Sequence, residues 1–135
     1  MSPTLTALVA FAVWSGLLVF GLANYRILYA QRTKKDVNTF KPDGSDLEGL
    51  GQRWTRAHLN CLEFLPIAAT VGLAAVVSGK AAVTDPLAMV LLYLRIGQSV
   101  VHLISTAVPY VMIRAVLFVG QLAIVLYWSY GLLTG

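Results

Sequence analysis

Long hydrophobic runs separated by short polar segments dominate the pattern along the chain. Four runs can be delimited, at residues 5–29, 53–78, 86–106 and 110–133. Each reaches the roughly 20 residues that an α-helix needs to cross the hydrocarbon core of a bilayer. The pattern therefore predicts an all-α integral membrane four-helix bundle, with residues 1–135 forming a single domain.

Composition supports a membrane protein. Hydrophobic residues make up 58% of the chain and charged residues 12%, and the mean hydropathy is +0.74. Soluble domains carry roughly one-quarter charged residues. The net charge of +4 could indicate nucleic-acid binding, but seven of the ten Lys and Arg residues lie between Arg26 and Arg56, beside two membrane entry points. We interpret this charge as a signal of topology and expect no nucleic-acid partner.

The basic segment also predicts the orientation of the bundle. Cytoplasmic loops carry an excess of Lys and Arg, so we expect the loop of residues 30–52 to be cytoplasmic. Pro42 and three glycines, Gly44, Gly49 and Gly51, indicate an irregular connection. Such a loop could fold over the mouth of a site.

The second run carries a one-sided polar stripe. Arg53, Arg56, Asn60 and Glu63 are spaced by three, four and three residues, which places them on one face of a helix. Counted from Arg53, Glu63 lies roughly 15 Å into the span at 1.5 Å per residue. A carboxylate at that depth requires a partner or a function.

The third run has a second stripe, made of Arg95, Gln98, Ser99 and His102. If the two runs are antiparallel, Arg95 lies at a depth similar to that of Glu63, and we predict an ion pair between them. One interpretation is that this pair is purely structural. The other is a polar ligand site, which we favour because four further side chains face the same crevice: Arg56, Asn60, Gln98 and His102.

Two further features bear on the chemistry. Arg114 follows Pro109 at the start of the fourth run, where it adds positive charge to the crevice or anchors the helix at the interface. A metal site is not expected, because His58 and His102 are the only histidines and no second carboxylate shares their depth.

The string RAHLNCLEFLP resembles the signature of the MAPEG family, the membrane-associated proteins of eicosanoid and glutathione metabolism. Arg56, Asn60, Glu63 and Pro66 stand in the order of that signature. The residues of this motif are similar to those of microsomal glutathione transferase, prostaglandin E synthase and the leukotriene-forming synthase. RAVLFVG, residues 114–120, resembles the opening of helix four in bacterial members. The resemblance covers essentially the whole chain.

The resemblance implies a homotrimer that binds glutathione as a cosubstrate at protomer interfaces near the cytoplasmic face. It implies a glutathione-dependent transferase or peroxidase acting on lipophilic electrophiles, expected in a bacterial inner membrane. Arg114 would be catalytic and stabilise the glutathione thiolate. The cofactor-binding residues would be Arg56, Asn60, Glu63, Gln98, His102 and Arg26.

Some positions depart from the pattern of prostaglandin E synthase. Leu59, Gln98 and His102 replace Arg, His and Tyr, and Ala115 and Phe118 replace Ser and Tyr. The lost hydroxyls would have assisted the thiolate, so the alternative to the enzyme is a non-catalytic lipid-binding or scaffold member of the family. A small proton-coupled multidrug exporter is disfavoured, since such exporters carry an essential Glu in helix one and the first run has no acidic residue.

Overall fold

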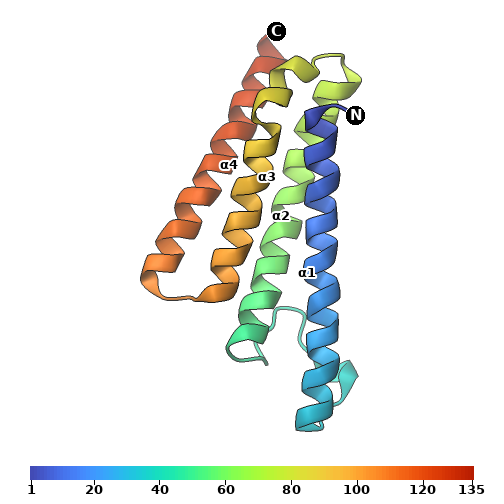
Figure 1. The fold of residues 1–135 in the computed structure, drawn as a ribbon, viewed down its shortest axis with the longest axis vertical. Coiled ribbons are helices and arrows are strands. Elements are labelled where there is room, and N and C mark those ends of the chain that lie inside the picture. The colour runs from blue at the N-terminus through green and yellow to red at the C-terminus, as the bar shows by residue number, and fades with distance from the viewer.

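The computed structural model describes residues 1–135 and confirms the all-α prediction. It contains the helices α1 (Pro3–Thr33), α2 (Leu50–Val77), α3 (Ala81–Ile104) and α4 (Val108–Thr134), with a short 3-10 helix, η1 (Val37–Thr39), in the first loop. All four α-helices are long and apolar enough to cross a membrane. They run up and down side by side, with both termini at one end and the long loop at the other, which we call the loop end (Figure 1).

The helices begin and end within three residues of the predicted runs except at two boundaries. α1 continues four residues past residue 29, because its polar last turn can extend beyond the hydrocarbon, and its C-cap residue, Lys34, has a left-handed φ of 57°. α3 begins at Ala81, five residues before the proline that was expected to start it. Hydrogen bonds hold this early start: the backbone N–H and hydroxyl of Thr4 donate to Asp85 Oδ1 at 3.1 and 2.6 Å.

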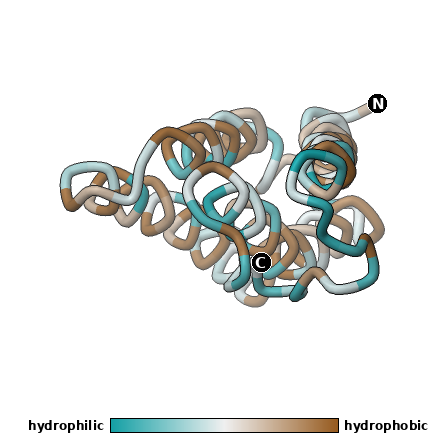
Figure 2. Tube along the Cα trace, turned by 90° about the horizontal axis from the view of Figure 1, so that it is seen from below, coloured by the Kyte–Doolittle hydropathy of each residue, from teal (hydrophilic) through white to brown (hydrophobic).

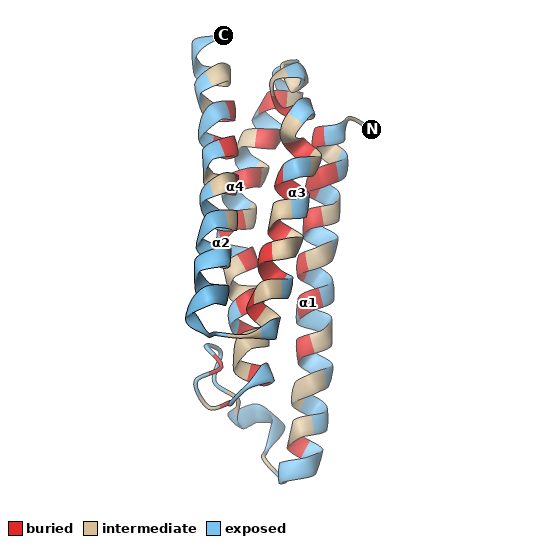
Figure 3. Cartoon of the chain, turned by 60° about the vertical axis from the view of Figure 1, so that its left-hand side comes forward, coloured by how far each residue is buried: buried red, intermediate tan, exposed pale blue.

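The buried residues lie along the inner faces of the helices (Figure 3). Phe11, Phe64, Leu91 and Trp128 are among the most buried, while large apolar side chains elsewhere are exposed, as expected for a surface that faces lipid. Hydrophobic residues accordingly recur in the turns of all four helices (Figure 2). α4 buries only four residues, all at or after Gln121, so its first half is open on the surface of the single chain.

Close contact between α1 and α2 fixes the start of α2. The indole Nε1 of Trp54 donates to the carbonyl of Leu18 at 2.9 Å. Its ring fills the space above Gly21, where any Cβ would overlap it. This packing, a few residues before Arg56, sets the rotation of α2 and therefore the direction of its polar stripe.

Candidate functional site

A buried polar cluster lies at the centre of the bundle, and it corrects one prediction. Arg95 is fully buried but does not pair with Glu63. Instead its Nη1 donates to Asn60 Oδ1 at 2.7 Å and its Nε donates to Gln121 Oε1 at 2.8 Å. The predicted Glu63–Arg95 ion pair is wrong, because Asn60 lies one turn closer to the loop end and reaches Arg95 with a neutral oxygen.

Four side chains close this cluster into a ring, which we call the Arg95 ring: Arg95, Asn60, Gln98 and Gln121. The amide of Gln121 donates to Gln98 Oε1 at 2.7 Å, and the amide of Gln98 donates to Asn60 Oδ1 at 3.0 Å. Arginine can only donate, so it fixes which way every amide in the ring points. Asn60 therefore turns its oxygen inward and leaves its Nδ2 donor for the surface.

Two aromatic rings complete the surroundings of Arg95. Its guanidinium carbon lies 4.9 Å from the ring centroid of Phe64 and 5.6 Å from that of Phe11. Cation–π contacts of this kind stabilise a guanidinium that has been removed from water. Two hydrogen-bonding partners and two aromatic faces thus accommodate most of the buried charge without a carboxylate, and only Nη2 of Arg95 has no hydrogen-bond partner.

A polar cavity of about 360 Å³ opens beside the Arg95 ring at the loop end, between α2, α4 and the first loop. Its lining comes from the first loop, α2, α3 and α4: Asp43, Ser45, Arg56, Leu59, Asn60, Glu63, His102 and Arg114. The stripe of α2 supplies three of them. Five of the seven predicted ligand-binding or catalytic residues are thereby brought together: Arg56, Asn60, Glu63, His102 and Arg114.

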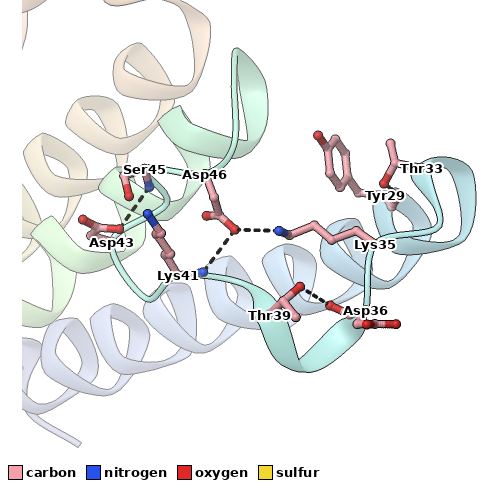
Figure 4. Close-up of polar contacts among 9 residues, drawn as sticks. All are labelled: Tyr29, Thr33, Lys35, Asp36, Thr39, Lys41, Asp43, Ser45 and Asp46. Atoms are coloured by element: carbon pink, nitrogen blue, oxygen red, sulfur yellow. Dashed lines mark hydrogen bonds and ion pairs between the residues drawn. The ribbon is translucent and has the colours of Figure 1, made fainter.

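The first loop reaches this cavity through a tight turn at Gly44. Its φ is 74°, and a Cβ there would lie 2.8 Å from Cβ of Thr55 on α2. Ser45 N–H donates to Asp43 Oδ1 at 3.0 Å, and this hydrogen bond lowers the pKa of Asp43 from its usual value. The carboxylate of Asp43 is thus held in its charged form at the mouth of the cavity (Figure 4).

The charges that line the cavity do not neutralise one another. The single salt bridge of the chain joins Lys35 and Asp46, at 3.4 Å in the loop. Arg56 and Glu63 are exposed, and Nε of Arg114 is buried without a hydrogen-bond partner. Two guanidiniums and two carboxylates, those of Glu63 and Asp43, therefore face one cavity without pairing.

A second, apolar cavity of about 190 Å³ continues from the polar one along α2 and α4. Its walls are Phe64, Ile67, Phe118 and Leu122. Asn60 and Glu63 line both cavities, so the two spaces meet at these side chains. The junction can place a polar group and an apolar group of different molecules next to each other.

Two predicted site residues lie elsewhere in the single chain. Gln98 is buried in the Arg95 ring and does not line the polar cavity. Arg26 lies on α1 in a separate pocket with Phe40. Conversely, sequence reasoning missed Gln121 and Asp43. A lone Gln in an apolar run was the available signal for the first, and the Pro-Asp-Gly turn for the second.

Comparison with known proteins identifies the family. A model of the MAPEG family matches residues 4–134. The chain belongs to the MAPEG family. No curated protein and no solved structure matched it. MAPEG proteins are integral membrane proteins that include glutathione transferases and synthases as well as non-catalytic members, and this chain shares their four-helix architecture.

Proposed function

We propose that this chain is a glutathione-dependent membrane transferase or peroxidase that acts on lipophilic electrophiles. The observation that carries the proposal is the polar cavity, in which charges of both signs remain unpaired beside an apolar cavity. Glutathione is a zwitterion with two carboxylates, one ammonium group and a thiol. Arg56 suits a carboxylate, and Glu63 and Asp43 suit the ammonium group.

Arg114 is the residue that we assign to the thiol. A free thiol has a pKa of about 8.5, so only a small fraction is thiolate at neutral pH. A nearby guanidinium lowers that pKa and raises the concentration of the nucleophile. Arg114 lies across the cavity from α2, and its Nε lacks a partner that would compete for it. The thiolate sulfur would attack an electrophile held in the apolar cavity, and the leaving group would depart with the electron pair.

The same surface supports a homotrimer. Glu63 lies 13 residues after Leu50, roughly 20 Å along α2, and is exposed in the single chain. A carboxylate at that depth is costly to leave in contact with lipid. A neighbouring copy that covers the groove between α2 and α4 would shield Glu63 and close the cavity. In this arrangement the loop end faces the cytoplasm, in agreement with its basic residues.

A second candidate function is lipid binding without catalysis. Phe118 stands where a Tyr is expected, and its ring packs edge-on against Phe64 at a centroid distance of 6.0 Å. The cavity wall is therefore apolar where a hydroxyl would assist a thiolate. Under this alternative the two cavities hold the head and tail of one amphipathic molecule.

Thermal unfolding of the detergent-solubilised chain with millimolar glutathione tests the proposal. Glutathione should raise the melting temperature, because a ligand that prefers the native state stabilises it. Arg56→Ala should abolish the shift. Arg53→Ala is the matched control, since its Nε binds the carbonyl of Leu103, outside the cavity. No shift in the wild type would overturn glutathione binding.

A conjugation assay separates the two candidate functions. With glutathione and a generic aromatic halide, an enzyme produces the thioether and releases halide, and the rate depends on Arg114. A shift in melting temperature without any turnover over a panel of halides and hydroperoxides would favour the non-catalytic candidate.

A further inference from the structure

A cavity of about 490 Å³ lies at the end of the bundle that holds both termini, far from the loop end. It is formed by the first turns of α3 and the last turns of α4, which lie side by side (Figure 1). Tyr130 in its lining comes 16 residues after Arg114, roughly 24 Å along α4. No residue lines both this cavity and either cavity of the loop end. The structure therefore has a third cavity that the proposed glutathione chemistry does not use.

Close packing of α3 and α4 gives this cavity a fixed base. A Cβ on Gly131 would lie 2.9 Å from Cγ1 of Val83, so the two helices touch there and leave no room for a side chain. Leu87 of α3 and Tyr127 of α4 contribute to the mainly apolar lining. A cavity of this volume is within the range that holds small-molecule ligands.

Polar groups without their usual partners interrupt this apolar lining. Pro86 has no N–H, so the carbonyl of Ala82, four residues earlier, lacks the donor that an α-helix normally supplies. The side chains of Tyr127 and Tyr130 are 60% and 69% exposed, and their hydroxyls form no hydrogen bond within the chain. A ligand in this cavity can therefore offer a hydroxyl to the carbonyl and an acceptor oxygen to the phenols.

Lys80 adds a positive charge at the rim of the cavity. Its Nζ donates to the carbonyl of Leu132 at 3.4 Å, beside Gly131 of the lining, and it forms no salt bridge. That carbonyl carries no net charge, so the ammonium charge is not cancelled. Asp85, the nearest acidic residue in the sequence, instead accepts from the N–H and hydroxyl of Thr4 on α1. The rim is therefore positive, and an anion complements it.

The position of the cavity in the membrane indicates the kind of anion. Lys80 lies in the short connection between α2 and α3, at the level of the lipid headgroups, where tyrosines are also favoured. Leu87 comes seven residues later, roughly 10 Å deeper toward the hydrocarbon. Val90, one turn deeper again, is 43% exposed. An acyl chain can cover this apolar surface below the cation, whereas a water-soluble anion would leave it uncovered.

We propose that this cavity binds an anionic phospholipid with a hydroxylated headgroup, in the leaflet opposite the loop end. Lys80 and the hydroxyl of Tyr130 hold the phosphate, and the carbonyl of Ala82 accepts from a headgroup hydroxyl. The first methylenes of an acyl chain lie against Leu87 and Tyr127. The bound lipid joins the start of α3 to the end of α4 and so stabilises this end of the bundle.

Photocrosslinking of the full chain in phosphatidylcholine nanodiscs tests this site. The probe is phosphatidylglycerol with a diazirine on its acyl chain, and peptide mass spectrometry maps the labelled residues. Labelling should concentrate at the start of α3 and the end of α4, and phosphatidylcholine with the same diazirine should label these peptides several-fold less. Equal labelling by the two lipids would indicate unselective contact with the bilayer and overturn the site.

Two charge variants test the role of Lys80. Lys80→Gln should reduce labelling of these peptides by phosphatidylglycerol by about fivefold, as expected for one basic residue at a lipid surface. Lys34→Gln removes an equal charge from an exposed residue at the loop end and should change this labelling less than twofold. Equal reductions in the two variants would assign the attraction to net charge and contradict a site at Lys80.

Further measurements distinguish the occupant. Ala82→Trp places an indole in the cavity without changing any charge and should abolish the labelling. Leu133→Trp adds the same indole to an exposed position of α4 outside the cavity and should leave the labelling nearly unchanged. Glycerol phosphate, which has the anion but no acyl chains, should fail to compete. Effective competition by glycerol phosphate would indicate a site for a soluble anion, and absence of labelling in the wild type would indicate that another copy of the chain covers the groove. Either result would overturn the lipid assignment.

Discussion

Two arginines of this protein lie in opposite electrostatic situations. Arg95, at the centre of the bundle, is fully buried and has two amide partners and two aromatic faces, and only its Nη2 lacks a hydrogen-bond partner. Arg114, at the loop end, faces a cavity together with Arg56 and has no partner for its Nε. A guanidinium that is held mainly by partners inside the bundle contributes to structure, whereas one that faces a cavity with few partners is available to a ligand. The contrast divides the polar residues of the bundle into a scaffold and a site.

Asn60 connects the two regions. Its oxygen is occupied by Arg95 and Gln98, so its remaining amide donor is presented to both cavities in one orientation. The Arg95 ring thus positions a site residue without contacting a ligand itself. Preorganisation of this kind lowers the cost of binding, because the donor does not need to reorient.

The largest effect is expected for Arg114, whose loss should reduce turnover. Arg114→Leu should reduce turnover by about 10²-fold while glutathione affinity changes by only a few fold, because one preorganised charge at the thiolate is lost. Steady-state kinetics should be accompanied by the ultraviolet absorbance of the bound thiolate, which should fall in parallel. Full turnover and an undiminished thiolate signal would show that Arg114 is only an interfacial anchor.

Loss of a hydrogen-bond partner of Arg95 should lower the free energy of unfolding, whereas loss of Arg114 lowers turnover. Gln121→Met keeps the volume of the side chain but strands Nε of Arg95 and the oxygen of Gln98, so the free energy of unfolding should fall by about 2 kcal/mol. Glu63→Gln should change it by less than about 0.5 kcal/mol, because Glu63 is exposed and not bound to Arg95. Denaturation in mixed detergent micelles measures both. Similar losses of stability in the two variants would contradict the amide partners of Arg95 and support the predicted Glu63–Arg95 ion pair instead.

The sequence was sufficient to predict the number of helices and the polar face of α2, because both depend on periodicity along one chain segment. It also placed Glu63 and Arg95 at similar depths. Whether two side chains at one depth touch depends on helix rotation, and that is fixed by distant contacts such as Trp54 against Gly21. A single-chain pattern carries no information on such contacts. Gln121 was missed for the same reason, since its role exists only through two partners on α3, Arg95 and Gln98.

The smallest effect concerns the loop, where the same contrast recurs between two carboxylates. Asp43 faces the cavity and forms no ion pair, although it accepts from Ser45 N–H, whereas Asp46 accepts from the backbone N–H of Lys41 at 3.1 Å and pairs with Lys35 (Figure 4). Partial burial acts to raise the pKa of Asp46, but hydrogen bonds from Lys41 and Lys35 outweigh it, and the pKa is lowered. Because the folded-state pKa lies below the unfolded value of about 3.9, the ionised carboxylate stabilises the loop above that pH.

This stabilisation should disappear as the pH falls through the folded-state pKa of Asp46, and carbon-13 NMR of the labelled carboxyl can follow the titration. Lys35→Gln should raise the midpoint toward the unfolded value, because it removes both a hydrogen bond and an opposite charge. Lys34→Gln removes an equal charge from the neighbouring exposed residue, which does not contact Asp46, and should leave the midpoint nearly unchanged. If both variants raised the midpoint equally, the net charge of the loop would control this carboxylate, and Asp46 would not be a specifically satisfied group.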